Sequence, residues 1–422
     1  MKIAIATAVY HPMINGVAVF SHNLAMGLVA RGHEVLVICP SQTGKNYTRT
    51  EDGVKVCRLK SIQAKVYPDQ IHEVSEKRKL WYRHGFRVSV FPKREVKRAL
   101  DEFKPDVVHV QVSDPIGLSV VGYARKYQIP VVTTEHNQPE VITEPLHVPG
   151  LVKKPIDALL SAYFVNRQSK SDFVTMPTKQ AIDNLILSRG KEFPVPVAAV
   201  SNGVDLSHFK PGKAPEALYK KYNIPKERPI VLYVGRVDPE KNVGMVVAAF
   251  SLVLQKVPEA VLVVVGDGVD KARLIKETAK MGISNSVRFL GRVVGEDLYE
   301  IYKMGWVFVT ASEIETQGIV LIEAAASGLP LVAVNAGAVN EICVNNENGF
   351  LIEIKINGNR VMIPKLQVMI SEAVMKILED TKLRERFSVN SVKFAQKHDF
   401  KNTLDSFINI YQRVMILHNE VK

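Results

Sequence analysis

The sequence predicts an α/β protein made of two doubly wound domains, each with a largely parallel sheet covered by helices on both faces. Short runs rich in Val and Ile alternate with helix-length amphipathic segments, as expected when buried parallel strands are joined by helical crossovers. This series stops in a proline-rich stretch at 192–229 and then starts again. A chain of 422 residues is long enough for two or three domains.

The expected strands are the short apolar runs that are bounded by turn residues. In the first half they lie at 2–9, 34–39, 54–59, 107–110, 131–134 and 173–176. In the second half they lie at 230–234, 261–265, 287–290, 307–310 and 331–334. We expect the boundary near Asn202, with an amino-terminal domain at 1–201, a carboxyl-terminal domain at 202–399 and a helical segment at 400–422. The periodicity leaves open which domain that last segment packs against.

The composition favours an anionic partner and a reducing compartment. Lys and Arg number 55 against 43 Asp and Glu, a formal charge of +12, which leaves nucleic acid, acidic lipid and phosphorylated substrates open. Three widely spaced cysteines without a C-x-x-C motif indicate neither a disulfide framework nor a zinc site, so we expect a cytoplasmic protein. No apolar run approaches the roughly 18 residues of a membrane span, and any membrane contact is therefore expected to be peripheral.

Two motifs of the first half follow predicted strands, at the edge where open α/β sheets bind ligands. Gly16 precedes the first helix-like segment, and its backbone N–H can approach an anion there, although a plain turn glycine is an equally good interpretation. His136 can hydrogen-bond a sugar hydroxyl or a developing charge, or it can serve a structural role. His109 and Gln111, at the end of the preceding strand, are weaker candidates of the same kind.

Two cations follow the first strand of the second half. Arg236 and Lys241 are expected at the carboxyl edge of the sheet, where a guanidinium fork and a compact ammonium can neutralise a departing nucleoside diphosphate. A solvated loop whose own carboxylates pair with these cations is the alternative. After the next two strands, Gly266 permits a tight turn and Val293 lies where backbone groups can pair with the edge of a base.

The most informative pair of residues is Glu315 and Glu323. Glu315 lies in the expected turn after the run at 307–310, and Glu323 follows eight residues later in the next helix. Because a loop can fold back over the helix that it precedes, one carboxylate can meet a sugar and the other a ribose, while Gly318 exposes N–H groups to phosphate. The structural alternatives are a helix-dipole carboxylate for Glu315 and a partly buried ion-pair partner for Glu323.

Half of the excess positive charge lies in residues 76–104, where ten Lys and Arg face four acidic residues. Trp81, Tyr82, Phe86 and Phe91 are interleaved with these cations, a composition suited to an anionic membrane surface. A solvated basic helix is the alternative. Such a segment can also stack on single-stranded nucleic acid, but no RNP, KH or helix-turn-helix signature accompanies it, so nucleic acid is not an expected partner.

Taken together and in this order, the motifs resemble those of the glycosyltransferases of family 4, which are retaining enzymes of the GT-B fold. They are Asn15-Gly16, His136, Ser201 to Asp205 with Phe209 and Pro211, Gly235-Arg236 with Lys241-Asn242, Gly266-Asp267-Gly268, and the E-x7-E of Glu315 and Glu323. The resemblance covers nearly the whole chain. It implies two Rossmann-like domains facing across a cleft, a nucleotide-sugar in the second, an acceptor in the first, and a last helix that crosses back to the first domain.

The resemblance also implies roles for individual residues. The catalytic residues would be His136, Glu315, Arg236 and Lys241. The donor-binding residues would be Gly16, Arg236, Lys241, Gly266, Val293, Gln317, Gly318, Ile319 and Glu323. Arg236 and Lys241 would hold the diphosphate and Glu323 the ribose. No metal and no cofactor besides the nucleotide-sugar are expected, because cations and helix N-termini supply the positive field.

The string Glu315-Thr316-Gln317-Gly318 departs from that of many members, which have a small residue and Phe before the Gly, and looks like that of diacylglycerol glucosyltransferases. With the basic segment at 76–104, it predicts transfer of glucose from UDP-glucose to diacylglycerol or a related lipid at the inner face of the cell membrane. A soluble family-4 enzyme that acts on a polysaccharide or a small molecule is the main alternative. A sugar-nucleotide epimerase is a more distant one, and the stretch at 353–364 has no functional interpretation.

Overall fold

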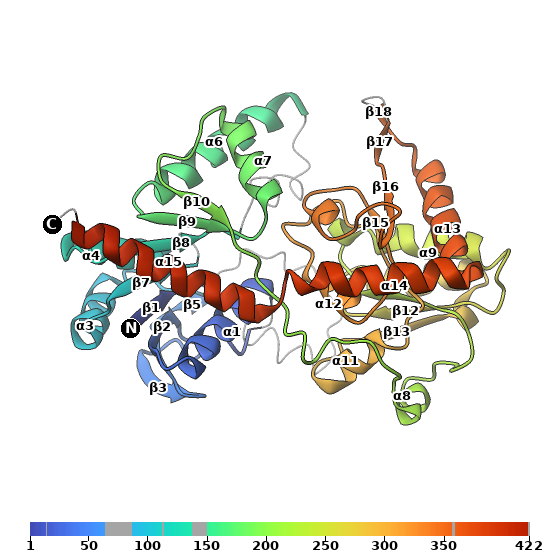
Figure 1. The fold of residues 1–422 in the computed structure, drawn as a ribbon, viewed down its shortest axis with the longest axis horizontal. Coiled ribbons are helices and arrows are strands. Elements are labelled where there is room, and N and C mark those ends of the chain that lie inside the picture. Colours follow the sequence, from blue (N-terminus) through green and yellow to red (C-terminus); the bar gives the residue numbers. More distant parts are fainter. Residues whose placement is uncertain (14, 64–86, 112–113, 137–149, 357–358, 421–422) are drawn as a thin grey trace. The chain divides into compact units, whose positions relative to one another are not determined.

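The protein, described here from a computed structural model, divides into two compact units (Figure 1). The structure describes residues 1–13, 15–63, 87–111, 114–136, 150–356 and 359–420. Unit 1 comprises Met1–Asn202 and Thr403–Lys422, and unit 2 comprises Gly203–Asn402. Each unit contains a mainly parallel sheet with helices between its strands, which confirms the predicted fold class.

Unit 1 is built on an eight-stranded sheet of order β10-β9-β8-β7-β1-β2-β4-β3, parallel throughout except for the β3–β4 hairpin. The strands are β1 (Lys2–Ala6), β2 (Glu34–Pro40), β3 (Tyr47–Glu51), β4 (Val54–Leu59), β7 (Val107–Val110), β8 (Val131–Thr134), β9 (Phe173–Met176) and β10 (Val197–Ala199), with a separate pair β5 (Ile62–Gln63) and β6 (Arg87–Val88). The helices are α1 (Gly16–Ala30), α3 (Lys93–Phe103), α4 (Pro115–Lys126), α6 (Gly150–Gln168), α7 (Lys179–Arg189) and α15 (Phe400–Glu420).

Unit 2 is built on a six-stranded parallel sheet of order β13-β12-β11-β14-β15-β16. Its strands are β11 (Ile230–Val234), β12 (Val261–Val265), β13 (Val287–Gly291), β14 (Val307–Thr310), β15 (Leu331–Val334) and β16 (Gly349–Ile352), followed by the hairpin β17 (Lys355–Ile356) and β18 (Asn359–Arg360). Its α-helices are α8 (Glu216–Lys221), α9 (Val243–Val253), α10 (Lys271–Lys280), α11 (Glu296–Tyr302), α12 (Ile319–Ala326), α13 (Ile363–Glu379) and α14 (Thr381–Gln396). Short 3-10 turns occur at Pro239–Lys241, Ser284–Ser286 and Val339–Glu341.

The unit 2 sheet is buried on both faces. Val231 and Tyr233 of β11 belong to one hydrophobic cluster, whereas Leu232 and Val234 belong to another. Because successive side chains of a strand point to opposite faces, this division shows a core on each side of the sheet. Burial on both sides explains why the strands read as continuous apolar runs and not as alternating patterns.

Side-chain caps set the start of several helices. The side chains of Asn15, Asp114, Thr178 and Asp380 each accept a hydrogen bond from a backbone N–H in the first turn of α1, α4, α7 and α14, respectively. Such a cap satisfies one of the backbone donors that a helix start leaves unpaired, and contributes about 1 kcal/mol. The cap at Asn15 fixes the start of α1 at Gly16.

The last helix, α15, packs within unit 1 (Figure 1). A Cβ built at Gly27 of α1 would lie 2.6 Å from the Leu404 side chain, so the two helices approach closely at a glycine. Further along α15, the ring of Phe407 lies 5.8 Å from that of Phe20. The helix is thus joined to the element that begins at Gly16.

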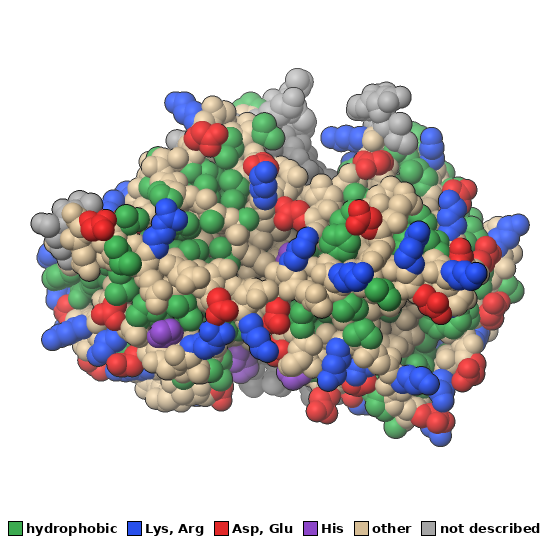
Figure 2. All heavy atoms as spheres, viewed as in Figure 1, with side chains coloured by type: hydrophobic (Ala, Val, Ile, Leu, Met, Phe, Trp, Pro, Cys, Tyr) green, Lys and Arg blue, Asp and Glu red, His purple; other side chains and the backbone are tan. Residues whose placement is uncertain are grey.

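Charges of both signs are interspersed on the face of each unit that Figure 2 shows. Lys and Arg side chains do not gather into one continuous area on that face. In the described parts of the chain, no helix combines the length and the apolar character needed to cross a membrane.

Candidate active site

Most of the predicted donor residues of unit 2 lie in the loops that follow β13, β12, β11 and β14, and Ile319 and Glu323 lie in the helix after β14. These four strands are consecutive neighbours in the sheet and run parallel. Their carboxyl ends therefore meet at one edge, which is where open α/β sheets bind ligands. The structure thus brings the loops carrying Arg236, Gly266, Val293 and Glu315 to a common edge.

Glycines allow two of these loops to touch through their backbones. A Cβ at Gly266 would lie 1.7 Å from the carbonyl oxygen of Gly235, and one at Gly268 would lie 2.1 Å from that of Val237. No side chain fits at either contact without a shift of the backbone. These contacts give Gly266 a structural reason to be glycine, and its predicted contact with the donor stays a prediction.

Lys241 and Glu315, both predicted to be catalytic, form an ion pair. The ammonium nitrogen of Lys241 lies 2.6 Å from Oε1 of Glu315, and the two side chains are only 19% and 14% exposed. The same ammonium also donates to the carbonyl oxygen of Ile314 at 3.3 Å. The backbone of Glu315 is held in turn, because its carbonyl accepts a hydrogen bond from the N–H of Ala338 at 3.1 Å. The pair is therefore positioned and partly shielded from water, so the attraction between its charges is screened less than in an exposed pair.

Arg236 is more exposed and is paired with carboxylates of its own loop. Its guanidinium lies 2.5 Å from Asp238 and also contacts Glu240, as the alternative interpretation of this loop anticipated. The side chain is 52% exposed, which leaves it accessible to a ligand. Its backbone is anchored, since the hydroxyl of Tyr233 donates to the Arg236 carbonyl at 2.7 Å. An incoming diphosphate would have to replace these carboxylates.

Glu323 lies in α12, and its carboxylate accepts a hydrogen bond from the hydroxyl of Tyr302 at 2.7 Å. Burial raises the pKa of Glu323 to about 7, and the Tyr302 hydrogen bond opposes part of that rise. Tyr302 itself is fully buried and has a pKa well above its ordinary value, so it remains a donor. Tyr302 was not predicted as a site residue, because its place in the sequence indicates only an aromatic residue of the core.

The start of α12 carries the remaining predicted donor residues of this loop. Gly318 adopts a left-handed backbone with φ of 77°, which side chains disfavour, and Ile319 begins the helix. Gln317 is buried, with 3% of its surface exposed. The predicted role of the first N–H groups of this helix as donors to an anion stays a prediction.

In unit 1, Gly16 is the first residue of α1 and is exposed. Its neighbour Asn15 caps the helix by accepting from the N–H of Ala18 at 2.8 Å. No described atom lies within 4 Å of a Cβ built at Gly16, so the described protein atoms do not require glycine there. The predicted phosphate contact at Gly16 stays a prediction.

His136 lies two residues after the end of β8. Its side chain is almost completely buried, with 8% of the residue's surface exposed. Its Nε2 lies 2.8 Å from Oε1 of Gln111, and its ring lies 5.2 Å from that of Phe20. Burial lowers the pKa of His136 to about 4, so the ring is neutral near pH 7. His109 and Gln111 have no exposed surface at all. The expectation that they face a ligand is therefore wrong, because both lie in the core behind His136.

Part of the basic segment at 76–104 lies outside the described residues, including Trp81, Tyr82 and Phe86. In the described part, Phe91 is 89% exposed and Val90 is 46% exposed, immediately before α3. The helix continues with Lys93, Arg94 and further cations. Exposed apolar groups are thus adjacent to positive charge in the sequence, as predicted for this segment.

The stretch at 353–364, which had no interpretation from sequence, contains the β17–β18 hairpin and is bonded to two loops at the same sheet edge. Nη2 of Arg360 lies 2.6 and 2.7 Å from the two carboxylate oxygens of Glu313, in the loop that carries Glu315. The amide of Asn335, after β15, donates to Glu353 at 2.7 Å. The hairpin is therefore attached to the loop that holds the Lys241–Glu315 pair.

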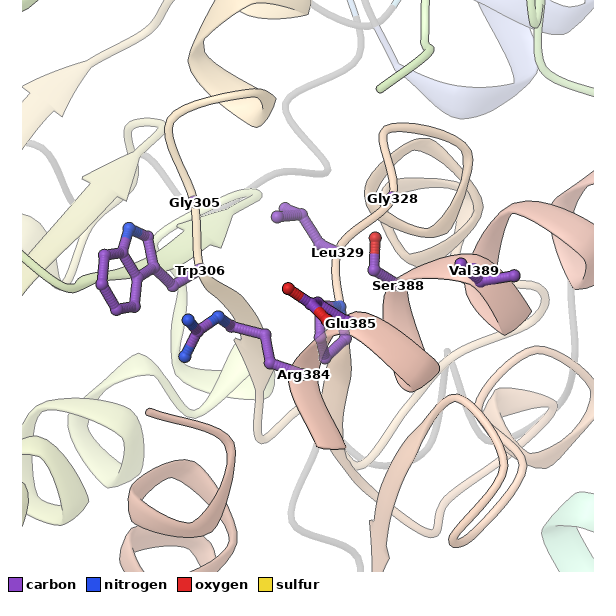
Figure 3. A pocket seen from close by; sticks show the side chains of 9 residues that line it. Gly305, Trp306, Gly328, Leu329, Arg384, Glu385, Ser388 and Val389 are labelled. Atoms are coloured by element: carbon purple, nitrogen blue, oxygen red, sulfur yellow. The ribbon is translucent and has the colours of Figure 1, made fainter. Parts of the chain in front are cut away.

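A cavity of about 330 Å³ lies elsewhere in unit 2 (Figure 3). It is lined by Trp306 and Pro330, which precede β14 and β15, and so lies at the amino ends of those strands. The Arg384 guanidinium lies 4.3 Å from the centre of the Trp306 ring. The cavity is therefore at the opposite edge of the sheet from the predicted donor residues. Among the described residues, no group of three His, Cys, Asp or Glu side chains is arranged to hold a metal ion.

Comparison with known proteins identifies two families of domain. Residues 14–208 match the model of Glycosyltransferase Family 4, and residues 216–394 match that of Glycosyl transferases group 1. The chain is 29% identical to alpha-monoglucosyldiacylglycerol synthase of Acholeplasma laidlawii over 87% of each chain. It is 30% identical to a GDP-mannose-dependent alpha-mannosyltransferase of Mycobacterium tuberculosis over 84% of each chain.

Among solved structures, sucrose-phosphate synthase of Thermosynechococcus elongatus matches with a TM-score of 0.72 and 19% identity, over 99% of each chain. At this level of identity the likeness establishes the fold alone. That fold is GT-B, with two α/β domains, in agreement with the sequence prediction.

Proposed function

Because the chain belongs to glycosyltransferase family 4, we propose that it transfers a hexose, with retention of configuration, from a nucleotide-sugar to a lipid acceptor. The preferred donor in this proposal is UDP-glucose, and the acceptor is diacylglycerol or a related lipid. The enzyme is proposed to be cytoplasmic and bound peripherally to the inner face of the cell membrane. No metal and no cofactor besides the donor enter the proposal.

One observation carries the catalytic part of this proposal, namely the half-buried Lys241–Glu315 pair at the carboxyl edge of the unit 2 sheet. A diphosphate carries more negative charge than one carboxylate, so it can draw the Lys241 ammonium away from Glu315. Lys241 and Arg236 then stabilise the leaving diphosphate, and Glu315 is released to hold hydroxyl groups of the donor sugar. Glu323 accepts from the ribose hydroxyls.

The proposed transfer is a displacement on one face of the sugar. The bond from the anomeric carbon to the diphosphate oxygen breaks, the acceptor oxygen bonds to the same carbon, and the leaving phosphate oxygen takes the acceptor proton. His136 is neutral near pH 7, so it acts as a hydrogen-bond partner of the sugar and not as a cation. Gly16 contributes its N–H to the phosphate at the start of α1.

Three observations support a lipid acceptor. A relative that is 29% identical over 87% of the chain is named as a synthase of a glucosyldiacylglycerol. The string Glu315-Thr316-Gln317-Gly318 looks like that of such enzymes. Phe91 is 89% exposed beside the cations of α3, a combination that suits an anionic membrane surface.

The proposal is tested by transfer from labelled UDP-, GDP- and ADP-sugars into a lipid extract, with water-soluble acceptors run alongside. We expect label in the organic phase from UDP-glucose. The Lys241→Ala variant provides the control for enzyme-dependent transfer. Label only in water-soluble products would contradict the lipid acceptor, and label from another donor would contradict UDP-glucose.

Membrane attachment is tested separately by sedimentation with anionic vesicles. We expect Phe91→Ser to weaken binding by roughly tenfold, because an aromatic side chain contributes about 1.5 kcal/mol or more when it is buried in an interface. Ile275→Ser, which changes a 45% exposed residue of α10 in unit 2, is the matched control. Equal binding of both variants and the wild type would contradict a role for this segment.

A second candidate function is favoured by the similarity to glycogen synthase of Mycobacterium tuberculosis, which is 27% identical over 83% of the chain. It is a soluble family-4 transferase with a polysaccharide or small-molecule acceptor. The same panel of donors separates the two candidates, because this one predicts label in the aqueous phase and no dependence of activity on vesicles.

A further inference from the structure

The core of unit 1 contains a row of polar side chains that runs from α15 to His136. The hydroxyl of Tyr411 lies 2.7 Å from Nδ1 of His109, and Nε2 of His109 lies 2.7 Å from the hydroxyl of Thr134. The amide nitrogen of Gln111 lies 3.2 and 3.3 Å from the two ring nitrogens of His109. The amide oxygen of Gln111 lies 2.8 Å from Nε2 of His136. The Tyr411–His109, His109–Thr134 and Gln111–His136 contacts are within hydrogen-bond distance, and the Gln111 amide nitrogen packs over the His109 ring.

The chemistry of these groups determines the state of the His136 ring. The amide nitrogen of Gln111 is nearly equidistant from the two ring nitrogens of His109, so it lies over the face of that ring. An N–H can donate to the π electrons there, whereas a carbonyl oxygen would be repelled, so the amide oxygen is the atom that faces His136. An oxygen without a proton accepts, and Nε2 of His136 must therefore carry the hydrogen. A neutral imidazole with hydrogen on Nε2 has its lone pair on Nδ1, where it accepts a hydrogen bond from a hydroxyl.

Helix α15 contributes packing as well as the Tyr411 hydroxyl. The Phe407 ring lies 5.1 Å from the His109 ring and 5.8 Å from Phe20. Phe20 in turn lies edge-on to His136 at 5.2 Å. One helix thus restrains His136 by two routes, through the hydrogen bonds of His109 and Gln111 and through the ring of Phe20.

From these contacts we infer that Tyr411, His109 and Gln111 are positioning residues that hold His136 as the neutral ring with hydrogen on Nε2 and its lone pair on Nδ1. Helix α15 then has a functional role in unit 1, because it sets the state of His136. This inference rests on the proposed function insofar as His136 contacts the donor sugar. The tautomer and orientation of the ring can be measured without any transfer reaction.

A purely structural network would satisfy buried polar groups and stabilise the unit without setting the state of His136. If the network is only structural, loss of the Tyr411 hydroxyl from α15 lowers stability and leaves the His136 ring unchanged. If it positions His136, the same loss changes the tautomer of that ring. Thr403, on the same helix, donates to the carbonyl of Ser201 at 2.9 Å and lies outside the row. Thr403→Val therefore removes a buried hydroxyl from α15 without touching it, and is the matched control for Tyr411→Phe.

The direct measurement is nuclear magnetic resonance of the full chain with ¹⁵N-labelled histidine, because ring nitrogens with and without hydrogen have well-separated shifts. His136→Asn assigns the His136 signals by their loss. In the wild type and in Thr403→Val we expect hydrogen on Nε2 of His136. In Tyr411→Phe we expect a shift of its signals toward a mixture of tautomers, and in Gln111→Met a larger shift, since the acceptor itself is lost.

Kinetics provide the second measurement. Tyr411→Phe is expected to lower kcat by roughly tenfold, as do losses of groups that orient a functional histidine, with KM for the donor changed less than twofold. Thr403→Val is expected to match the wild type in both constants. Unchanged His136 signals in Tyr411→Phe would overturn the role of α15, and unchanged signals in Gln111→Met would overturn the whole inference.

The failure of the proposed function has a different signature. If His136→Asn retains full transfer activity, His136 has no catalytic role, while the shifts of its ring still decide whether α15 and Gln111 hold the tautomer. If the signals respond as expected and kcat does not, the positioning is real but is not used in the reaction.

Discussion

The predicted donor residues of unit 2 and the residues around His136 in unit 1 differ in both charge and burial. In unit 2 the site is made of ions, with Lys241 paired to Glu315 and Arg236 to carboxylates of its loop. In unit 1 it is made of neutral groups, because burial lowers the pKa of His109 to about 3 and that of His136 to about 4. One region is organised by charge and the other by hydrogen bonds in the core.

This difference indicates how each region responds to substitution. Removal of one ion in unit 2 leaves its partner without compensation and also removes charge that stabilises a diphosphate. Removal of one hydrogen-bonding group in unit 1 leaves the charge unchanged and affects only the position of its neighbours. We therefore expect the larger losses of activity in unit 2, and the predictions below test that order.

The largest effect is expected from Lys241→Ala, and a similar one from Arg236→Ala. Each should lower kcat by roughly 100-fold or more, because the transition state develops negative charge on the leaving diphosphate. The measurement is steady-state transfer with the preferred donor. Lys221→Ala, which breaks an exposed pair with Asp297 in the same unit, is the control and should leave kcat unchanged. Near-normal rates for Lys241→Ala would refute the proposed role.

Glu323→Gln is expected to remove a pH dependence of stability. The pKa of Glu323 is about 7 in the folded protein, above its unfolded value, so the wild type loses stability as the pH rises from about 4.5 to about 7. This loss is about 3 kcal/mol at most, since each unit of pKa corresponds to about 1.4 kcal/mol. Chemical unfolding of the ligand-free protein at several pH values measures it. If the free energy of unfolding depends on pH in the same way in the wild type and in Glu323→Gln, the pKa of Glu323 is not raised by folding.

Tyr302→Phe should have a smaller effect on the same carboxylate. The variant removes the hydroxyl that donates to Glu323 at 2.7 Å and lowers its pKa, so the pKa of Glu323 should rise further. A hydrogen bond to a charged group contributes about 1.5–3 kcal/mol. The pKa of Glu323 should therefore rise by no more than about two units. The pH profile of unfolding should move to higher pH by comparison with the wild type, and an unmoved profile would rule out this hydrogen bond as a determinant.

The smallest effect is expected from Arg360→Ala. Its pair with Glu313 joins the β17–β18 hairpin to the loop of Glu315, but the Arg360 side chain is 65% exposed. Exposed pairs contribute about 0.2–1 kcal/mol, so KM for the donor should change by no more than about fivefold. Glu313→Gln should give the same result, because it breaks the same pair. A tenfold change in either variant would show that the hairpin controls the donor loop.

The fold was largely predictable because its central strands are buried on both sides. The ranges expected at 107–110, 131–134, 173–176 and 230–234 are those of β7, β8, β9 and β11. Of the strands in the two main sheets, β3, β10 and β16 were not predicted, and each lies at an edge of its sheet. The two-residue strands of the β5–β6 and β17–β18 pairs were not predicted either. An edge strand has a neighbour on one side only, and β3 and β10 contain no buried residue, so their apolar patterns are weak.

One missed element had a readable signal. Asp52 and Gly53 both adopt positive φ in the turn of the β3–β4 hairpin. An Asp-Gly pair between two short strands is a strong indication of such a turn. The turn was therefore predictable from the sequence. The strand β3 was not, because its residues are exposed or only partly buried and show no apolar pattern.

By itself, the sequence determined the fold class, the central strands and the sheet edge at which Arg236, Lys241 and Glu315 are placed. These follow from local patterns, since a run of apolar residues defines a strand and the residues after it lie at its carboxyl end. Only the tertiary structure decided which side chains meet there. Tyr411 and His109 are 302 positions apart, and Tyr302 reaches Glu323 from another helix. Periodicity specifies which face of an element is buried, but the partner on that face is set by the packing of elements that are distant in the chain.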